Sequence, residues 1–337
     1  MQNEGVFRTS GQQNPVQITL FCVPGFSMIA LASFIEPLRL ANFLTNRQLY
    51  QWRVVSLDGT PTVPSSGVSV GADCAISDCP NPSNIVVVGG LATHAFSDAS
   101  VTNWLRHSAR KGVYIGGLCT ASHVLARAGL LNGYRCTIHW SGMDSIMEDF
   151  PELDLKLELF EIDRDRFTCA GGVAALDMCL HDIAKRHSPT LAAAVSDQMM
   201  HERIRAGNDN QRLPLQTRLR ISHPKLIKAI AEMEQNTEMA LDRTEIAARV
   251  NLSRRQLERL FRRYLNTSPA RFYLRLRLNR ARMLLNQTTL PVTEIAFACG
   301  FTSASHFSKC YRELFLQTPR SERALDMGEV SPLILRQ

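Results

Sequence analysis

"LDRTEIAARVNLSRRQLERLFRRYL" (residues 241–265) decides how the last third of this chain folds, because a related stretch follows it. In "LPVTEIAFACGFTSASHFSKCYRELF" (290–315) the tetrapeptide Thr-Glu-Ile-Ala returns, and Tyr311 matches Phe261 fifty residues on. A duplicated supersecondary unit explains these matches better than chance does.

Each copy has the pattern of a helix, a turn and a second helix. Asp242 and Glu245 have capping-box spacing for the first helix of the first copy. Asn251 follows that helix, and Gly300 stands at the same place in the second copy. Asn and Gly tolerate the left-handed conformation that a tight turn between helices requires.

The second helix of each copy, beginning near Ser253 or Ser303, has an apolar stripe at helical spacing, which predicts its buried face. The stripe residues are Leu257, Leu260, Phe261 and Tyr264, then Phe307, Cys310, Tyr311 and Leu314. The opposite face is polar, as in a helix that reads bases. The expected DNA-contacting residues are Arg254, Arg255, Glu258, Arg259, Ser305, Ser308 and Lys309. The alternative is a plain helical bundle with charged outer faces.

The positive charge is concentrated in the same region. Residues 221–325 hold 18 Lys and Arg against 9 Asp and Glu, a net +9, whereas the rest of the chain holds 20 against 22, a net −2. A near-neutral body joined to a basic module favours a polyanion as the partner of that module. Arg255 and Arg259 suit guanine edges, Glu258 suits cytosine, and Lys309 suits a base or a phosphate.

Residues 223–325 resemble the DNA-binding domain of the AraC/XylS family of transcriptional regulators. "SRRQLERLFRRYLNTSPARFYLRLRLNRARMLL" (253–285) and "CGFTSASHFSKCYRELFLQTPR" (299–320) carry the likeness, with Val292-Thr293 in place of the usual Ile-x. The resemblance implies two helix-turn-helix units joined by a long helix over 268–287. It also implies recognition helices in successive major grooves, about 34 Å apart.

The first two hundred residues alternate short β-branched stretches with amphipathic ones. Strands are predicted at 16–23, 52–59, 84–90, 112–117 and 136–140, and helices at 27–44 and 98–111. A further strand, glycine turn and helix occupy 168–187, and one more helix is predicted at 190–205. This alternation predicts an α/β domain, a parallel sheet flanked by helices, before an all-α C-terminal domain.

The composition sets the domain map and the broad class. We expect a flexible N-terminus (1–15), a ligand-sensing domain (16–205), a linker (206–222), the DNA-binding domain (223–325) and a tail (326–337). No apolar run approaches the ~20 residues that span a bilayer, and the N-terminus lacks the apolar stretch of a signal peptide. Nine cysteines form no CxxC pair, which favours a reduced, cytoplasmic protein with no metal site or cofactor.

"GVYIGGLCTASHVLARAGLL" (112–131) has the pattern of a nucleophile mounted on a sharp strand-to-helix turn, with Cys119 at the corner. Together with "IVVVGG" (85–90) and "RCTIHW" (135–140), it resembles the PfpI-type branch of the class I glutamine amidotransferase-like superfamily over residues 16–188. The resemblance implies a nucleophile at Cys119, a histidine at His139 and an acidic residue after the first strand. Ala30 stands at that acidic position, so we expect no catalysis.

A ligand pocket is expected where the carboxyl ends of the strands meet. Its predicted lining is Phe26, Gly90, Cys119, His139 and Trp140. The chain resembles the branch of regulators controlling arginine, glycine betaine or carnitine catabolism, through "ALASFIEPLRLAN" (30–42), "ARAGLLNGYRCTIHW" (126–140) and "HFSKCYRE" (306–313). A quaternary ammonium effector suits an aromatic lining, with Phe34 and Glu36 as further candidates. Packed core residues are the alternative for each.

These patterns predict a nucleoid-associated cytoplasmic regulator, an activator that binds double-stranded promoter repeats as a homodimer and contacts RNA polymerase, with no membrane partner. Two other functions remain open at this point. One is a PfpI-type cysteine hydrolase or amidotransferase with a DNA-tethering tail. The other is an architectural nucleoid protein that binds DNA without an effector.

Overall fold

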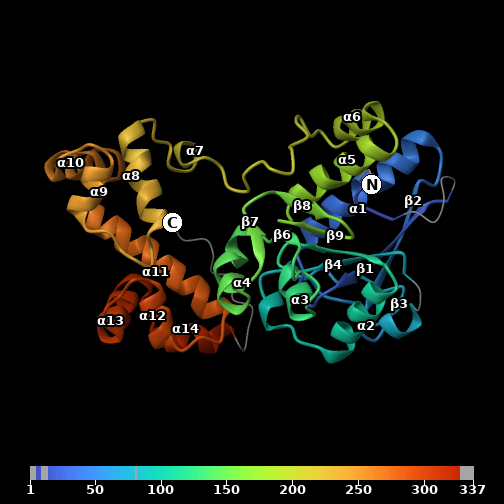
Figure 1. Cartoon of the computed structure of the whole chain (residues 1–337), viewed down its shortest axis with the longest axis horizontal. Coiled ribbons are helices and arrows are strands. Elements are labelled where there is room, and N and C mark those ends of the chain that lie inside the picture. Colours follow the sequence, from blue (N-terminus) through green and yellow to red (C-terminus); the bar gives the residue numbers. More distant parts are fainter. Residues whose placement is uncertain (1–4, 9–13, 80–81, 327–337) are drawn as a thin grey trace. The chain divides into compact units, whose positions relative to one another are not determined.

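The computed structural model describes residues 5–8, 14–79 and 82–326, and the chain divides into two compact units between Gln211 and Arg212 (Figure 1). The predicted tail beyond residue 326 lies outside the described residues.

The first unit is built on a seven-stranded sheet in the order β3-β2-β1-β4-β5-β9-β8. The strands are β1 (Val16–Cys22), β2 (Tyr50–Ser56), β3 (Cys74–Ala75), β4 (Asn84–Val88), β5 (Tyr114–Leu118), β8 (Phe160–Asp163) and β9 (Arg166–Cys169). All neighbours run parallel except β8, which is antiparallel to β9 at the sheet's edge. The predicted parallel sheet is therefore confirmed.

Helices cover both faces of this sheet. Helices α1 (Met28–Thr45), α5 (Ala174–Arg186) and α6 (Pro189–Gln198) bury one face together with Leu20 of β1. Helices α2 (Ala99–Arg110) and α3 (Ser122–Arg127) bury the other with Phe21. Side chains alternate across a strand, so consecutive β1 residues belong to different cores.

Helix α1 is long and apolar enough to cross a membrane when judged by length and composition alone. Its side chains Phe34, Leu38 and Ala41 are nevertheless fully buried in the core of the first unit. It is placed as the core helix of a globular domain.

Two expected elements differ from the structure. The predicted strand 136–140 is β6 (Arg135–Thr137), which pairs with β7 (Asp154–Lys156) in a separate two-stranded sheet. The remaining elements here are α4 (Met143–Asp149) and the 3₁₀ turns η1 (Ile76–Asp78), η2 (Thr93–Ala95) and η3 (Trp140–Gly142). The helix predicted at 190–205 ends at Gln198, because Met200 adopts a left-handed backbone (φ 52°) that no α-helix continues.

The chain ends of the first unit also differ from expectation. Val6 and Phe7 are buried in the core rather than flexible, and the Val6 amide donates to Asp182 Oδ1 at 2.6 Å. Residues 1–4 and 9–13 of the predicted flexible N-terminus lie outside the described residues. The first six residues of the predicted linker pack on this unit, since Gly207 O accepts from the Leu159 amide at 2.8 Å.

The second unit contains only helices among its described residues. They are α7 (Leu215–Leu219), α8 (Pro224–Gln235), α9 (Arg243–Arg249), α10 (Arg254–Leu265), α11 (Pro269–Gln287), α12 (Val292–Ala298), α13 (Ala304–Phe315) and α14 (Pro319–Asp326). The predicted capping box of Asp242 and Glu245 starts α9. Asn251 (φ 52°) and Gly300 (φ 72°) occupy the left-handed turn positions, as the repeat predicts.

Helix α11 joins two separate hydrophobic cores. Its first half contributes Tyr273 to the core of the first helix-turn-helix unit, and its second half contributes Leu278 and Leu284 to the core of the second. Figure 1 shows α9 and α10 near its N-terminal end and α12 to α14 around its C-terminal half.

Two arginines of α11 hold the second helix-turn-helix unit, and one of them also reaches the first. Arg277 donates to the Cys299 and Gly300 carbonyls at 2.7 and 2.9 Å, and its guanidinium lies 4.2 Å from the Phe301 ring centre. Arg280 donates to Thr237 Oγ1 at 2.8 Å and to the Ala298 carbonyl at 3.1 Å. Arg280 thus links the loop before α9 to the end of α12.

Gly300, in the turn between α12 and α13, lies against the loop that precedes α9. A Cβ at this position would lie 2.6 Å from the Glu238 carbonyl oxygen and 2.8 Å from that of Thr237. Only a residue without a side chain permits this approach.

We therefore expect Gly300→Ala to destabilise the second unit by more than about 1 kcal/mol, from backbone overlap and left-handed strain. Scanning calorimetry of the full chain measures this as a lower melting temperature for its C-terminal transition. Asn251→Gly, at the equivalent turn of the first copy, is the matched control and should leave that transition unchanged or raise it. An unchanged transition in Gly300→Ala would contradict the close approach.

Candidate functional sites

The recognition helices begin at well-defined caps. Ser253 Oγ accepts from the Gln256 backbone amide at 3.3 Å, and the Ser253 backbone amide donates to Gln256 Oε1 at 2.8 Å, which completes a capping box for α10. Ser303 caps α13 by accepting from the His306 amide at 3.4 Å. These caps set where each helix presents its outer face.

The predicted faces separate as expected, with one exception. Leu257, Leu260 and Phe261 are buried, as are Phe307, Cys310 and Tyr311 of the other copy, and Leu314 is half-buried. Tyr264, predicted as part of the buried stripe, is 40% exposed, and its ring lies tilted beside that of His223 at a centroid distance of 5.6 Å. Leu265, the last residue of α10, packs against this core in its place.

None of the seven predicted DNA-contacting side chains is buried. Arg254, Arg255, Arg259, Ser305 and Lys309 are exposed, and Glu258 and Ser308 are half-buried. Glu258 lies 3.6 Å from the Arg243 guanidinium of α9. This ion pair places the Arg243 guanidinium beside the predicted DNA-contacting residues of α10.

Cys119 lies at the corner between β5 and α3. Its backbone is left-handed (φ 62°), and its side chain is only 6% exposed. Burial raises the pKa of the Cys119 thiol to about 11, and hydrogen bonds with Thr120 offset only part of this rise. The thiol is therefore protonated at neutral pH, despite the elbow geometry.

The turns that follow neighbouring strands close over this corner. Thr120 Oγ1 donates to the Gly90 carbonyl, which ties the elbow to the turn after β4. A Cβ on Gly90 would overlap the Gly25 carbonyl and lie 2.9 Å from the Phe26 backbone. Phe26, Gly90 and Cys119 thus lie together, and Phe26 and Gly90 are buried.

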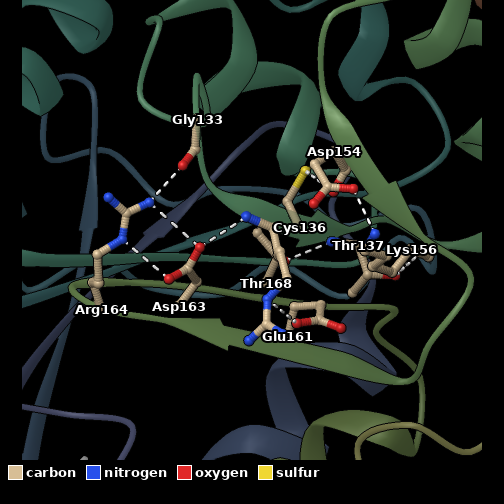
Figure 2. Close-up of polar contacts among 10 residues, drawn as sticks. Gly133, Cys136, Thr137, Asp154, Lys156, Glu161, Asp163, Arg164 and Thr168 are labelled. Carbon is tan, nitrogen blue, oxygen red and sulfur yellow. Dashed lines mark hydrogen bonds and ion pairs between the residues drawn. The ribbon is translucent and has the colours of Figure 1, made fainter.

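His139 joins this group through β6. Its amide donates to the Cys119 carbonyl at 3.0 Å. Figure 2 shows how β6 is held: the Thr137 amide donates to Thr168 Oγ1 of β9 at 2.7 Å, and Thr137 Oγ1 donates to the Lys156 carbonyl of β7 at 2.9 Å. The separate two-stranded sheet therefore positions His139 at the end of β5.

The His139 ring is turned to its own loop. Its Nδ1 lies 2.8 Å from Ser141 Oγ and accepts from the Ser141 amide at 3.3 Å, so the ring proton of the neutral form is on Nε2. Burial lowers the pKa of His139, which keeps the ring neutral at neutral pH. In the described part of the chain no hydrogen bond joins this ring to the Cys119 thiol.

Of the remaining candidates for the ligand pocket, Trp140 lies beside His139, whereas Phe34 and Glu36 lie elsewhere. Trp140 is 38% exposed beside His139, with ring centroids 5.4 Å apart. Phe34 is fully buried against Phe7 in the core, and Glu36 pairs at the surface with Arg39 at 2.7 Å. Core and surface positions, rather than a pocket, account for these last two. Ala30 is buried in α1.

Three neighbours of the site escaped sequence reasoning. Gly171 (φ 77°) lies so close that a Cβ there would be 2.7 Å from the Cys119 Cα. His123 of α3 is buried, and its Nε2 lies 3.0 Å from Ser145 Oγ of α4. Only the paired glycines of "CAGG" (169–172) offered a local signal for any of them. The third, Gln211, donates to the Ile138 carbonyl from 73 residues away.

Comparison with known proteins gives matches to both units. Residues 18–185 match the DJ-1/PfpI family and residues 246–324 match a helix-turn-helix domain. The chain is 46% identical to the HTH-type transcriptional regulator GbdR of Pseudomonas aeruginosa over 92% of this chain and 85% of that protein. It is also 46% identical to CdhR of the same organism, over 90% of each. A crystal structure of an AraC family transcriptional regulator from Pseudomonas putida superimposes with a TM-score of 0.51 and 27% identity, over 55% of this chain and all of that one.

The raised pKa of Cys119 predicts low reactivity. At pH 8 a thiol with a pKa of about 11 is roughly 0.1% thiolate, so iodoacetamide should modify Cys119 far more slowly than the half-buried Cys74. The rate should rise as pH rises toward 11, and mass spectrometry of timed samples measures it. In urea the two cysteines should react alike. Rapid labelling of Cys119 in the native chain would contradict its buried, protonated state.

Proposed function

Because the chain belongs to the AraC-type HTH transcriptional regulators that carry a DJ-1/PfpI domain, we propose that it activates promoters with repeated half-sites in response to a small nitrogenous metabolite such as a betaine, carnitine or a basic amino acid. In this proposal residues 16–205 sense the effector, and residues 223–325 bind DNA. Two chains associate as a homodimer in the cytoplasm, at the nucleoid, and contact RNA polymerase.

The observation that carries the DNA part is the pair of matched helix-turn-helix units held on one helix. Arg255 and Arg259 are exposed on α10, and Lys309 is exposed on α13. Arginine pairs with guanine through two parallel hydrogen bonds, whereas lysine also serves as a phosphate contact. We assign base reading to the first two and an anchoring role to Lys309.

Arg259→Ala should weaken binding to the cognate promoter by about 1–3 kcal/mol and relax specificity at one base position. Lys309→Ala should weaken binding to all sequences and reduce the salt dependence. Footprinting and gel-shift titration at two salt concentrations measure both effects. Lys228→Ala, which removes an exposed charge from α8, is the control and should bind as wild type does. Equal loss in all three variants would argue for non-specific, architectural binding.

The effector is proposed to bind at the ends of β1, β4 and β5, beside the predicted lining residues. The exposed Trp140 ring next to neutral His139 supports a ligand with a diffuse positive charge, since such cations are attracted to aromatic faces. Glycine betaine, carnitine and arginine carry charges of this kind.

Among these three probes, at least one should stabilise the purified chain by about 2.7 kcal/mol at a concentration 100-fold above its dissociation constant. Trp140→Ala should weaken that binding by about 1–2 kcal/mol, the value of a partly desolvated cation–π contact. Thermal-shift titration measures both, with Tyr264→Ala, a similarly exposed aromatic of the second unit, as control. If none of the three probes stabilises the chain, the proposed effector class is ruled out.

The rival function is a cysteine hydrolase or amidotransferase tethered to DNA. We propose instead that Cys119 does no catalysis. Its raised thiol pKa, the engagement of His139 Nδ1 by Ser141, and Ala30 at the acidic position all support this assignment.

Cys119→Ala should accordingly retain effector-induced transcription within about twofold of wild type, because it removes no charge and creates only a small cavity. A promoter–reporter strain measures this, and the melting temperature of the purified variant serves as the control for folding. Complete loss of induction in a well-folded variant would favour the enzyme.

A further inference from the structure

We infer that residues 201–211, here called the exit segment, form a releasable strap, and that Gln211 reports the state of the Cys119 corner to the DNA-binding unit. This inference rests on the proposed function and adds a route of coupling to it. Gln211 acts as a positioning residue, since it touches the strand end that carries His139 rather than the effector itself.

The first anchor of the exit segment is a buried carboxylate. Asp177 of α5 is fully buried, and its Oδ1 accepts from His201 Nε2 and from the Arg205 amide, both at 2.8 Å. Its Oδ2 accepts from Arg205 Nε at 2.8 Å and lies 2.6 Å from Arg205 Nη2. A buried charge with these partners resists separation, because losing them would leave it uncompensated.

The middle of the exit segment lies along the start of β8. The Leu159 amide donates to the Gly207 carbonyl at 2.8 Å, and Glu158 and Asn210 form an isolated antiparallel bridge. A Cβ on Gly207 would lie 2.9 Å from the Phe160 ring and 3.0 Å from its carbonyl oxygen. Glycine therefore permits this close contact.

The second anchor is the Gln211 amide. Its Nε2 donates toward three oxygens: the Ile138 carbonyl at 2.8 Å, the Glu158 carbonyl at 2.9 Å and Thr137 Oγ1 at 3.0 Å. Three surrounding oxygens assign the nitrogen to this side of the amide. Gln211 Oε1 is buried and, within the described residues, accepts no hydrogen bond. This anchor is neutral and incompletely satisfied.

The second anchor shares its attachment with the Cys119 corner. Ile138 immediately precedes His139, whose amide donates to the Cys119 carbonyl at 3.0 Å. Thr137 is held on its other side by Thr168 of β9 (Figure 2). A ligand that displaces His139 therefore shifts the carbonyl that holds Gln211.

The two anchors differ in strength, so the exit segment is released at its Gln211 end and stays attached at its Asp177 end. Hydrogen bonds between charged groups are stronger than those between neutral ones, so the Asp177 anchor holds while the Gln211 anchor opens. Gln211 is also the last residue of the first unit. Releasing residues 206–211 adds up to about 20 Å of tether before the DNA-binding unit, at roughly 3.3 Å per residue. A longer tether changes which half-site spacings two linked units can reach.

Hydrogen–deuterium exchange of the full, ligand-free chain tests this coupling. Gln211→Glu places an acceptor against three oxygens, and Gln211→Met removes the amide with little change in length. Both should raise exchange at the Leu159 and Phe160 amides and at His139 by about fivefold or more, the lower end of ordinary coupling. The Arg205 amide should stay protected. Asn208→Ala, exposed in the same segment, is the matched control.

Faster exchange at Leu159 with no change at His139 would overturn the coupling, as would equal deprotection of Arg205. A second measurement uses the reporter strain with glycine betaine, carnitine or arginine. The Gln211 variants should lose about fivefold or more of the wild-type induction ratio while binding the inducing probe within about twofold of wild type. If wild type responds to none of the probes, the proposed effector class fails, and the exchange result still decides the coupling.

Discussion

The second unit depends on the guanidinium groups of Arg277 and Arg280. A long helix with a separate core at each end would leave its two helix-turn-helix units free to rotate about their contacts. Arg277 fastens the turn of the second unit to the helix, and Arg280 reaches from the end of α12 to the loop beside the first unit. Gly300 allows that loop and turn to touch. The placement of α13 relative to α10 within this unit is thus held by partly buried polar contacts that cannot be lost without leaving carbonyls or charge unpaired.

In the first unit, contacts to backbone carbonyls likewise hold the turns around Cys119 together. The elbow geometry survives, yet burial holds the thiol in its neutral form, and His139 directs its accepting nitrogen to Ser141. What remains at the ends of the strands is a set of turns, after β1, β4, β5 and β6, that bear directly on one another. Because these turns are packed against one another, moving one of them would displace its neighbours, as the proposed sensing role requires.

Patterns local to the chain were readable from the sequence. The copied helical pairs, their caps and the left-handed turn residues followed from spacing and residue type, because these depend on neighbours within a few positions. Partners far apart in sequence were not readable. Nothing near Arg135–Thr137 indicates that β6 leaves the main sheet for β7, and nothing near Gln211 points to Ile138. Val6 and Phe7 are buried by partners far along the chain, among them Asp182, 176 residues from Val6, and Phe167, so no local pattern marks them.

The two copies share a scaffold but not an outer face: Arg255, Glu258 and Arg259 on one correspond to Ser305, Ser308 and Lys309 on the other. Because the two outer faces differ, this DNA-binding unit has a polarity, and a base sequence offers it different contacts when the duplex is turned end for end.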